Sequence, residues 1–205
     1  FNVVPFTIAV KAAGPIRSPR DLVGRRITGH ANDAALLTFD LYAQAAGLDA
    51  RQVRVDGSMG GMGHAVADML RGDGADGVFG FVNTLIASAT PLGVDPAALR
   101  FLNWSDVLPD MYGNTLFVTR ETYRRSPELL RGLVQATNDG LADTVRAPEA
   151  AIDALMRHAP GSDRAVNLRR LKGTLAMRDA EYDAAVERYN QQVVDALREV
   201  IDQID

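Results

Sequence analysis

The chain of 205 residues contains no cysteine, which excludes disulfides, thiolate metal sites and a cysteine nucleophile. None of its apolar runs reaches the ~18 residues that a membrane-spanning helix needs, so we expect no direct membrane insertion. Lysine is almost missing, since Lys11 and Lys172 stand against twenty arginines. The net charge of −4 argues against nucleic acid as a partner.

Motifs for catalysis and for cofactor binding are also missing. The three histidines, His30, His64 and His158, are not spaced as metal ligands. No Gly-x-Ser-x-Gly motif occurs. The glycine-rich run 57–63 does not fit a dinucleotide fingerprint, because Val66 stands where the third glycine belongs. We therefore expect no catalytic residue, no metal site, no cofactor and no enzymatic activity.

Strand and helix patterns alternate through the first half of the chain, which predicts an α/β fold with a parallel or mixed sheet. Strands are expected at 6–10, 26–29, 52–56, 74–80 and 99–102, and helices at 34–46, 64–71 and 83–89. In the helix 34–46, the apolar residues 36, 37, 41 and 45 lie on one helical face. Such a sheet uses the carboxyl ends of its strands as the working surface.

The second half has a different pattern. One more strand is expected at 114–119, and helices are expected from Ser126 onward, at 127–146, at 148–158 and from about 179 to 204. Two of these helices begin with proline in the first turn, where its missing N–H and fixed φ are tolerated.

Residues 16–27 carry the most specific pattern, Ile-Arg-Ser-Pro-Arg-Asp-Leu-Val-Gly-Arg-Arg-Ile. Ser18 is expected to cap one helical turn that begins at Pro19 and ends at Gly24. This segment resembles the start of the second lobe in bacterial type II solute-binding proteins. Within them it is most similar to the NMT1-like group, which binds nitrate, sulfonates, taurine and thiamine-pyrimidine precursors for ABC importers.

The resemblance continues in register from about residue 5 to residue 160. The matching segments are 29–33 with 46–49, 69–72 with 75–77, 80–83, 112–116, and 127–131 with 139–140. It implies the type II periplasmic-binding-protein fold, in which two crossover strands form a hinge between two lobes. Residues 1–11 would close lobe 1 and contain the outgoing crossover, 12–112 would form lobe 2, and 113–205 would hold the return crossover and helices that pack on lobe 1. The first lobe would be incomplete.

The resemblance also implies a function. The chain would belong to the periplasmic substrate-binding component of an ABC importer, exported by a leader that this chain does not contain. It would close on a small planar or anionic solute and deliver it to the permease subunits. Two alternatives remain on the same fold: an enzyme similar to pyrimidine synthases or desulfinases, and a ligand-sensing effector domain of a regulator.

Polar residues and glycines at the expected strand ends are the candidate ligand contacts. His30, Asn32 and Asp33 follow one strand, where helix N–H groups can hold an anion; Asn32 and Asp33 could instead be plain helix caps. Gly60 and Gly61 follow the next strand, where the backbone could approach a ligand or only bend.

Further candidates lie along the rest of the α/β region. Phe81 and Asn83 follow a third strand, and Asn83 could bind a heteroaromatic or amide ligand or cap a helix. Trp104 could stack on a planar ligand or pack at the hinge. Tyr112 and Asn114 flank the expected return crossover.

Overall fold

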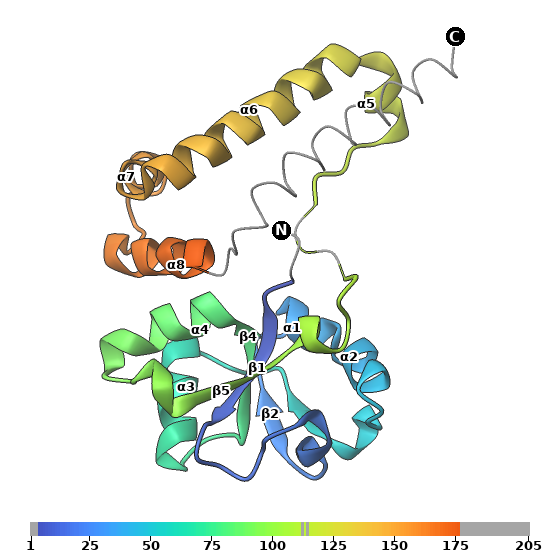
Figure 1. Ribbon diagram of the computed structural model, residues 1–205, viewed down its shortest axis with the longest axis vertical. Coiled ribbons are helices and arrows are strands. Elements are labelled where there is room, and N and C mark those ends of the chain that lie inside the picture. Colours follow the sequence, from blue (N-terminus) through green and yellow to red (C-terminus); the bar gives the residue numbers. More distant parts are fainter. Residues whose placement is uncertain (1–3, 112, 114, 177–205) are drawn as a thin grey trace.

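A mixed five-stranded sheet forms the centre of the first half of the chain in the computed structural model, which describes residues 4–111, 113 and 115–176 (Figure 1). Its strands are β1 (Phe6–Lys11), β2 (Arg26–Thr28), β3 (Arg54–Asp56), β4 (Gly77–Phe81) and β5 (Leu99–Asn103). Their order in the sheet is β3-β2-β4-β1-β5. The α/β class and all five strands of this region are therefore confirmed.

The strand β1 runs against its neighbours. It pairs antiparallel with both β4 and β5, whereas β2 is parallel to β3 and to β4. Five of its six residues are buried, as expected for a strand covered on both faces. Its alternating side chains divide between the two faces, so Ile8 and Val10 join one apolar cluster and Ala9 joins the other.

Helices cover both faces of the sheet (Figure 1). One face packs against α1 (Ala34–Leu37) and α2 (Phe39–Ala45), and the other packs against α3 (Met62–Arg71) and α4 (Val82–Ala89). Short 3-10 helices connect the elements at Pro19–Leu22, Ala50–Gln52, Thr90–Leu92, Pro96–Ala98 and Trp104–Asp106. The first of these is the predicted turn: Ser18 is its N-cap, and the Asp21 carboxylate accepts from the Ser18 N–H at 2.9 Å.

The predicted helix 34–46 is interrupted, and its buried side chains do not lie on the face of residues 36, 37, 41 and 45. The helix breaks at Thr38, whose hydroxyl donates to the Ala34 carbonyl at 2.7 Å. Leu37 and Leu41 are 66% and 47% exposed. The buried residues are Ala35, Phe39, Tyr42 and Ala43, because the two aromatic rings bury more apolar surface than the leucines on the other side.

The strand expected at 114–119 is also wrong where it can be judged, because residues 115–119 form neither strand nor helix. Phe117 is 90% exposed and Leu116 is 65% exposed. A strand needs a neighbour for its backbone N–H and C=O groups. The described residues place no strand beside this segment.

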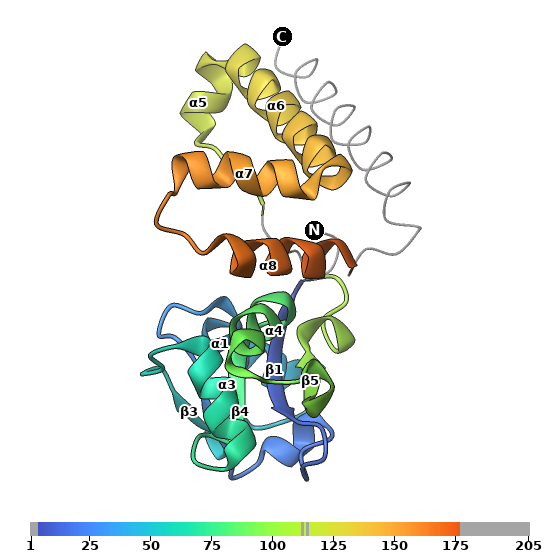
Figure 2. The same cartoon turned by 90° about the vertical axis from the view of Figure 1, so that its left-hand side faces the viewer.

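Four helices follow: α5 (Arg120–Arg125), α6 (Pro127–Arg146), α7 (Pro148–His158) and α8 (Arg164–Ala176). The starts at Ser126-Pro127 and Ala147-Pro148 are confirmed, α8 was not predicted, and the helix expected at 179–204 lies outside the described residues. Figures 1 and 2 show α5 to α7 standing away from the sheet, with α8 over α4. No described helix is long and apolar enough to span a bilayer.

We expect Gly63→Ala to lower the free energy of unfolding by about 3 kcal/mol, because the added methyl would be overpacked. Gly63 lies in α3 against α4, and a Cβ there would overlap the Ser88 carbonyl oxygen. The matched control is Gly60→Ala, whose Cβ would meet nothing within 4 Å. Denaturant unfolding followed by circular dichroism measures both. Equal stability of the two variants would contradict the close contact of α3 with α4.

Candidate ligand-binding site

The carboxyl ends of β2 and β3 are joined by backbone contacts at one edge of the sheet. The Gly29 N–H donates to the Asp56 carbonyl at 2.9 Å, and the Met59 N–H donates to the Gly29 carbonyl at 3.2 Å. An isolated bridge links His30 to Ser58. Gly29 allows a close approach here, since a Cβ there would lie 3.0 Å from the Phe79 Cβ. These contacts bring His30, Ser58 and the glycine-rich turn together.

The β2 loop contains three of the predicted site residues. Asp33 is the N-cap of α1, and its carboxylate accepts from the Ala35 N–H at 2.8 Å and from the Leu36 N–H at 3.3 Å. Asp33 is expected either to contact a ligand or to cap a helix, and in the structure its side chain caps α1. Asn32 is exposed and His30 is half-buried, so both side chains can reach a solute.

The β3 loop is ordered by its own side chains. The Asp56 carboxylate accepts from the Ser58 N–H at 2.9 Å and from the Ser58 hydroxyl at 2.6 Å. These hydrogen bonds lower the pKa of the Asp56 carboxyl, which stays ionised. Gly60 and Gly61 are exposed beyond this turn, and Gly61 is the N-cap of α3.

Two helix N-termini at this edge have no side-chain cap. The N-caps of α3 and α4 are Gly61 and Phe81, and neither has a side chain that accepts from the first turn. The first N–H groups of a helix have no partner within the helix, and they carry partial positive charge. In α3, which is ten residues long, the exposed His64 stands in the first turn. This end of α3 can therefore accept an anionic or strongly polar group.

Phe81 and Asn83 lie at the end of β4, where α8 covers α4. The Phe81 ring packs on Phe6 with centroids 5.1 Å apart. The Asn83 amide donates to the Thr174 hydroxyl and to the Arg170 carbonyl, the latter at 3.4 Å. Gly173 allows this approach, because a Cβ there would lie 3.3 Å from the Asn83 Cβ. Asn83 is thus engaged by α8 in this structure.

Trp104 lies in the core instead of at this edge. Its side chain is fully buried and stacks on Tyr42 with centroids 4.0 Å apart. The indole N–H donates to the Thr38 hydroxyl at 3.0 Å. The role of Trp104 as a ligand contact is therefore corrected to that of a packed core residue. Tyr112 and Asn114 lie outside the described residues.

Sequence reasoning missed Ser58 and His64 as parts of this edge. The rule that selected His30 after its strand would also have selected Ser58 after β3, because both positions follow the carboxyl end of a strand. Arg170 approaches from α8, which no local pattern connected to Asn83. Within the described residues, no group of three or more acidic or histidine side chains could hold a metal ion.

Comparisons with known proteins show the family and the fold of this chain. A family model described as NMT1/THI5 like matches residues 1–151. The 4-amino-5-hydroxymethyl-2-methylpyrimidine phosphate synthase of Legionella pneumophila is 29% identical over 156 residues, which are 75% of this chain and 46% of that protein. The chain thus spans about half the length of this curated relative.

Two solved structures share the fold. The periplasmic aliphatic sulphonate binding protein SsuA of Escherichia coli has a TM-score of 0.64 and 19% identity, over 97% of this chain and 61% of that one. The alkanesulfonate-binding protein SsuA of Xanthomonas axonopodis pv. citri, bound to MOPS, has a TM-score of 0.54 and 20% identity, over 96% and 66%. The predicted type II periplasmic-binding-protein fold is confirmed.

We expect Trp104→Ala to lower the free energy of unfolding by about 3–5 kcal/mol, because it leaves a cavity beside Tyr42. Thr38→Val, which removes the acceptor of the indole N–H together with the hydrogen bond from the Thr38 hydroxyl to the Ala34 carbonyl, should cost about 1–3 kcal/mol. Both changes are measured by urea unfolding followed by circular dichroism. If Trp104→Ala left stability unchanged and abolished solute binding, Trp104 would be a ligand contact and not a core residue.

Proposed function

The chain belongs to the NMT1/THI5-like family, and we propose that it is part of the substrate-binding component of a bacterial ABC importer. The protein captures a small planar or anionic solute, such as a sulfonate or a pyrimidine precursor, and delivers it to permease subunits in the membrane. It acts in the periplasm. The fold shared with two sulfonate-binding proteins supports this role.

The convergence of polar groups at the carboxyl edge of the sheet carries the proposal. His30 and Ser58 come from joined loops, and α3 points an uncapped N-terminus to the same edge, with His64 in its first turn. N–H and imidazole donors suit sulfonate, carboxylate or ring-nitrogen acceptors. The nearby carboxylates of Asp33 and Asp56 accept hydrogen bonds from within the chain through one oxygen each, so part of their negative charge is engaged by neighbouring donors.

Hinge closure is the mechanism that suits such an edge. A solute that contacts two lobes stabilises the closed form by its differential affinity for that form. Residues 12–112 would then be lobe 2, while 1–11 and 113–205 would connect it to lobe 1. Several apolar side chains of the described second half are exposed, which suits packing against lobe 1. They include Leu116, Phe117, Leu129, Leu133 and Leu141.

An enzyme on the same fold is the second candidate. The Legionella pneumophila relative carries the name of a pyrimidine phosphate synthase and is 29% identical over 156 residues. Such an enzyme would alter its bound molecule, whereas a binding protein releases it unchanged. The fate of the ligand therefore separates the two candidates.

We expect the full-length protein to bind an alkanesulfonate or a pyrimidine and to release it chemically unchanged. Thermal shift against sulfonates, pyrimidines, nitrate and carboxylates detects binding, because a ligand at a hundred times its Kd adds about 2.7 kcal/mol of stability. Mass spectrometry of the recovered ligand then decides between the candidates. Consumption of the ligand would favour the enzyme, and no binding by any probe would contradict the proposed role.

We expect His30→Ala and His64→Ala each to lower the affinity for the solute about tenfold, which is the loss expected for one hydrogen bond to a charged group. The matched control is His158→Ala, because His158 is exposed in the last turn of α7. Calorimetric titration measures the affinities. Equal affinity of all three variants would place the solute elsewhere.

A further inference from the structure

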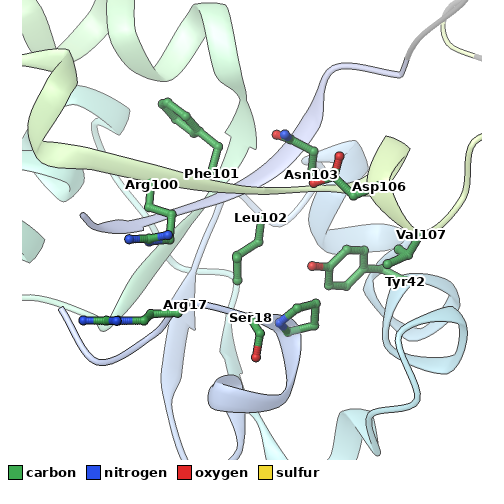
Figure 3. Close-up of a pocket in the computed structure, with 10 residues that line it drawn as sticks. Arg17, Ser18, Tyr42, Arg100, Phe101, Leu102, Asn103, Asp106 and Val107 are labelled. Atoms are coloured by element: carbon green, nitrogen blue, oxygen red, sulfur yellow. The ribbon is translucent and has the colours of Figure 1, made fainter. Parts of the chain in front are cut away.

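A hollow lies along the outer edge of β5 (Figure 3), at the opposite end of the sheet from β3. It has a volume of about 230 Å³ and is bounded by β5, by the loop before the first 3-10 helix and by α2. Leu102 and Pro19 form apolar parts of its wall.

The backbone at this edge has free hydrogen-bonding groups. β5 is the last strand of the described sheet and pairs only with β1. The Ala12 N–H donates to the Ala98 carbonyl at 2.8 Å, so residues 98, 100 and 102 turn their backbone groups toward β1. Phe101, between them, turns its N–H and C=O to the outer edge, where the described residues supply no strand to pair with them.

Positive charge gathers at one end of the hollow. In Figure 3, the guanidinium groups of Arg17 and Arg100 lie on the same side of it. Among the described residues, neither forms an ion pair. Arg100 donates to the Ala12 carbonyl at 3.1 Å, but its Nε is buried without a partner in the described structure. A buried donor of this kind normally has a hydrogen-bond acceptor, so this end suits a carboxylate.

The other end carries a carboxylate and a hydroxyl. Asp106 follows the carboxyl end of β5, and the Tyr42 hydroxyl points into the hollow from α2 (Figure 3). Burial, together with the nearby Asp106 carboxylate, raises the pKa of the Tyr42 hydroxyl, which stays protonated as a donor. The segment from residue 100 to residue 103 spans ~10 Å at the rise of a strand. A positive and a negative end are therefore separated by about the length of a short extended peptide.

We propose that this hollow binds a short zwitterionic peptide, about three residues long, as an additional antiparallel strand beside β5. Its terminal carboxylate meets Arg17 and Arg100, its main chain pairs with Phe101, and its terminal ammonium meets Asp106. Antiparallel addition follows from the charges, because a parallel peptide would bring its carboxylate to Asp106. Main-chain pairing of this kind is a common way for a free sheet edge to take up a peptide. The site is separate from the proposed solute site and does not depend on it.

Calorimetric titration of the full-length protein with trialanine tests the proposal. We expect trialanine to bind, and we expect both its C-terminal amide and its N-acetyl form to bind about tenfold more weakly, because each lacks one terminal charge. Inorganic phosphate should not displace the peptide. Absence of trialanine binding, equal affinity of the blocked forms, or displacement by phosphate would each overturn the proposal, the last in favour of a simple anion site.

Variants locate the site on the protein. Arg100→Gln and Arg17→Gln should each lower the affinity for trialanine about tenfold. Asp106→Asn should abolish the preference for trialanine with a free ammonium over its N-acetyl form. Arg54→Gln, on β3 at the opposite edge, is the matched control and should leave trialanine affinity unchanged. Circular dichroism confirms that each variant is folded. Full affinity in both Arg17→Gln and Arg100→Gln would overturn the proposal, whatever the solute site binds.

Discussion

The antiparallel pairing of β1 with both β4 and β5 holds the sheet together, and the rest of the α/β region depends on it. β1 joins β5 to a sheet whose other members are parallel. Its side chains also supply both cores, since Ile8 packs with Phe79 and Trp104 while Ala9 packs with Val78 and Leu85. A strand that is buried on both faces contributes apolar area to each layer of helices. Removal of β1 would leave β5 without a neighbour in the sheet.

Close approaches at glycine then fix the helices whose ends form the candidate solute site. Gly63 lets α3 touch α4 at Ser88, and Gly29 lets the β2 loop pass over Phe79. Because no side chain intervenes, the N-termini of α3 and α4 reach the same edge as His30 and Ser58. The geometry of the site is thus a consequence of the packing behind it, where a methyl group at Gly63 would overlap the Ser88 carbonyl oxygen.

The two candidate sites offer a ligand different hydrogen-bonding groups of the same α/β region. At the carboxyl ends of β2 to β4, helix N–H groups and imidazoles supply donors, and the carboxylates of Asp33 and Asp56 are bound to nearby backbone N–H groups. Along β5, the free backbone of an edge strand supplies both a donor and an acceptor, with charged side chains at the two ends. α8 adds a third element, because it covers the start of α4 and engages Asn83. A solute that needs the Asn83 amide would have to compete with this contact.

The sequence by itself determined the order of strands and helices in the α/β region, the capped turn after Ser18, the proline starts of α6 and α7, and the family resemblance. These features act over a few residues, through alternation, capping and the fixed φ of proline. Only the tertiary structure decided which face of residues 34–45 is buried, that Trp104 packs in the core, and that Asn83 is engaged by α8. Trp104 and its partner Thr38 are 66 residues apart, and Asn83 and Thr174 are 91 apart. Contacts between such distant residues depend on how the layers assemble, and the pattern around either residue alone does not identify its partner.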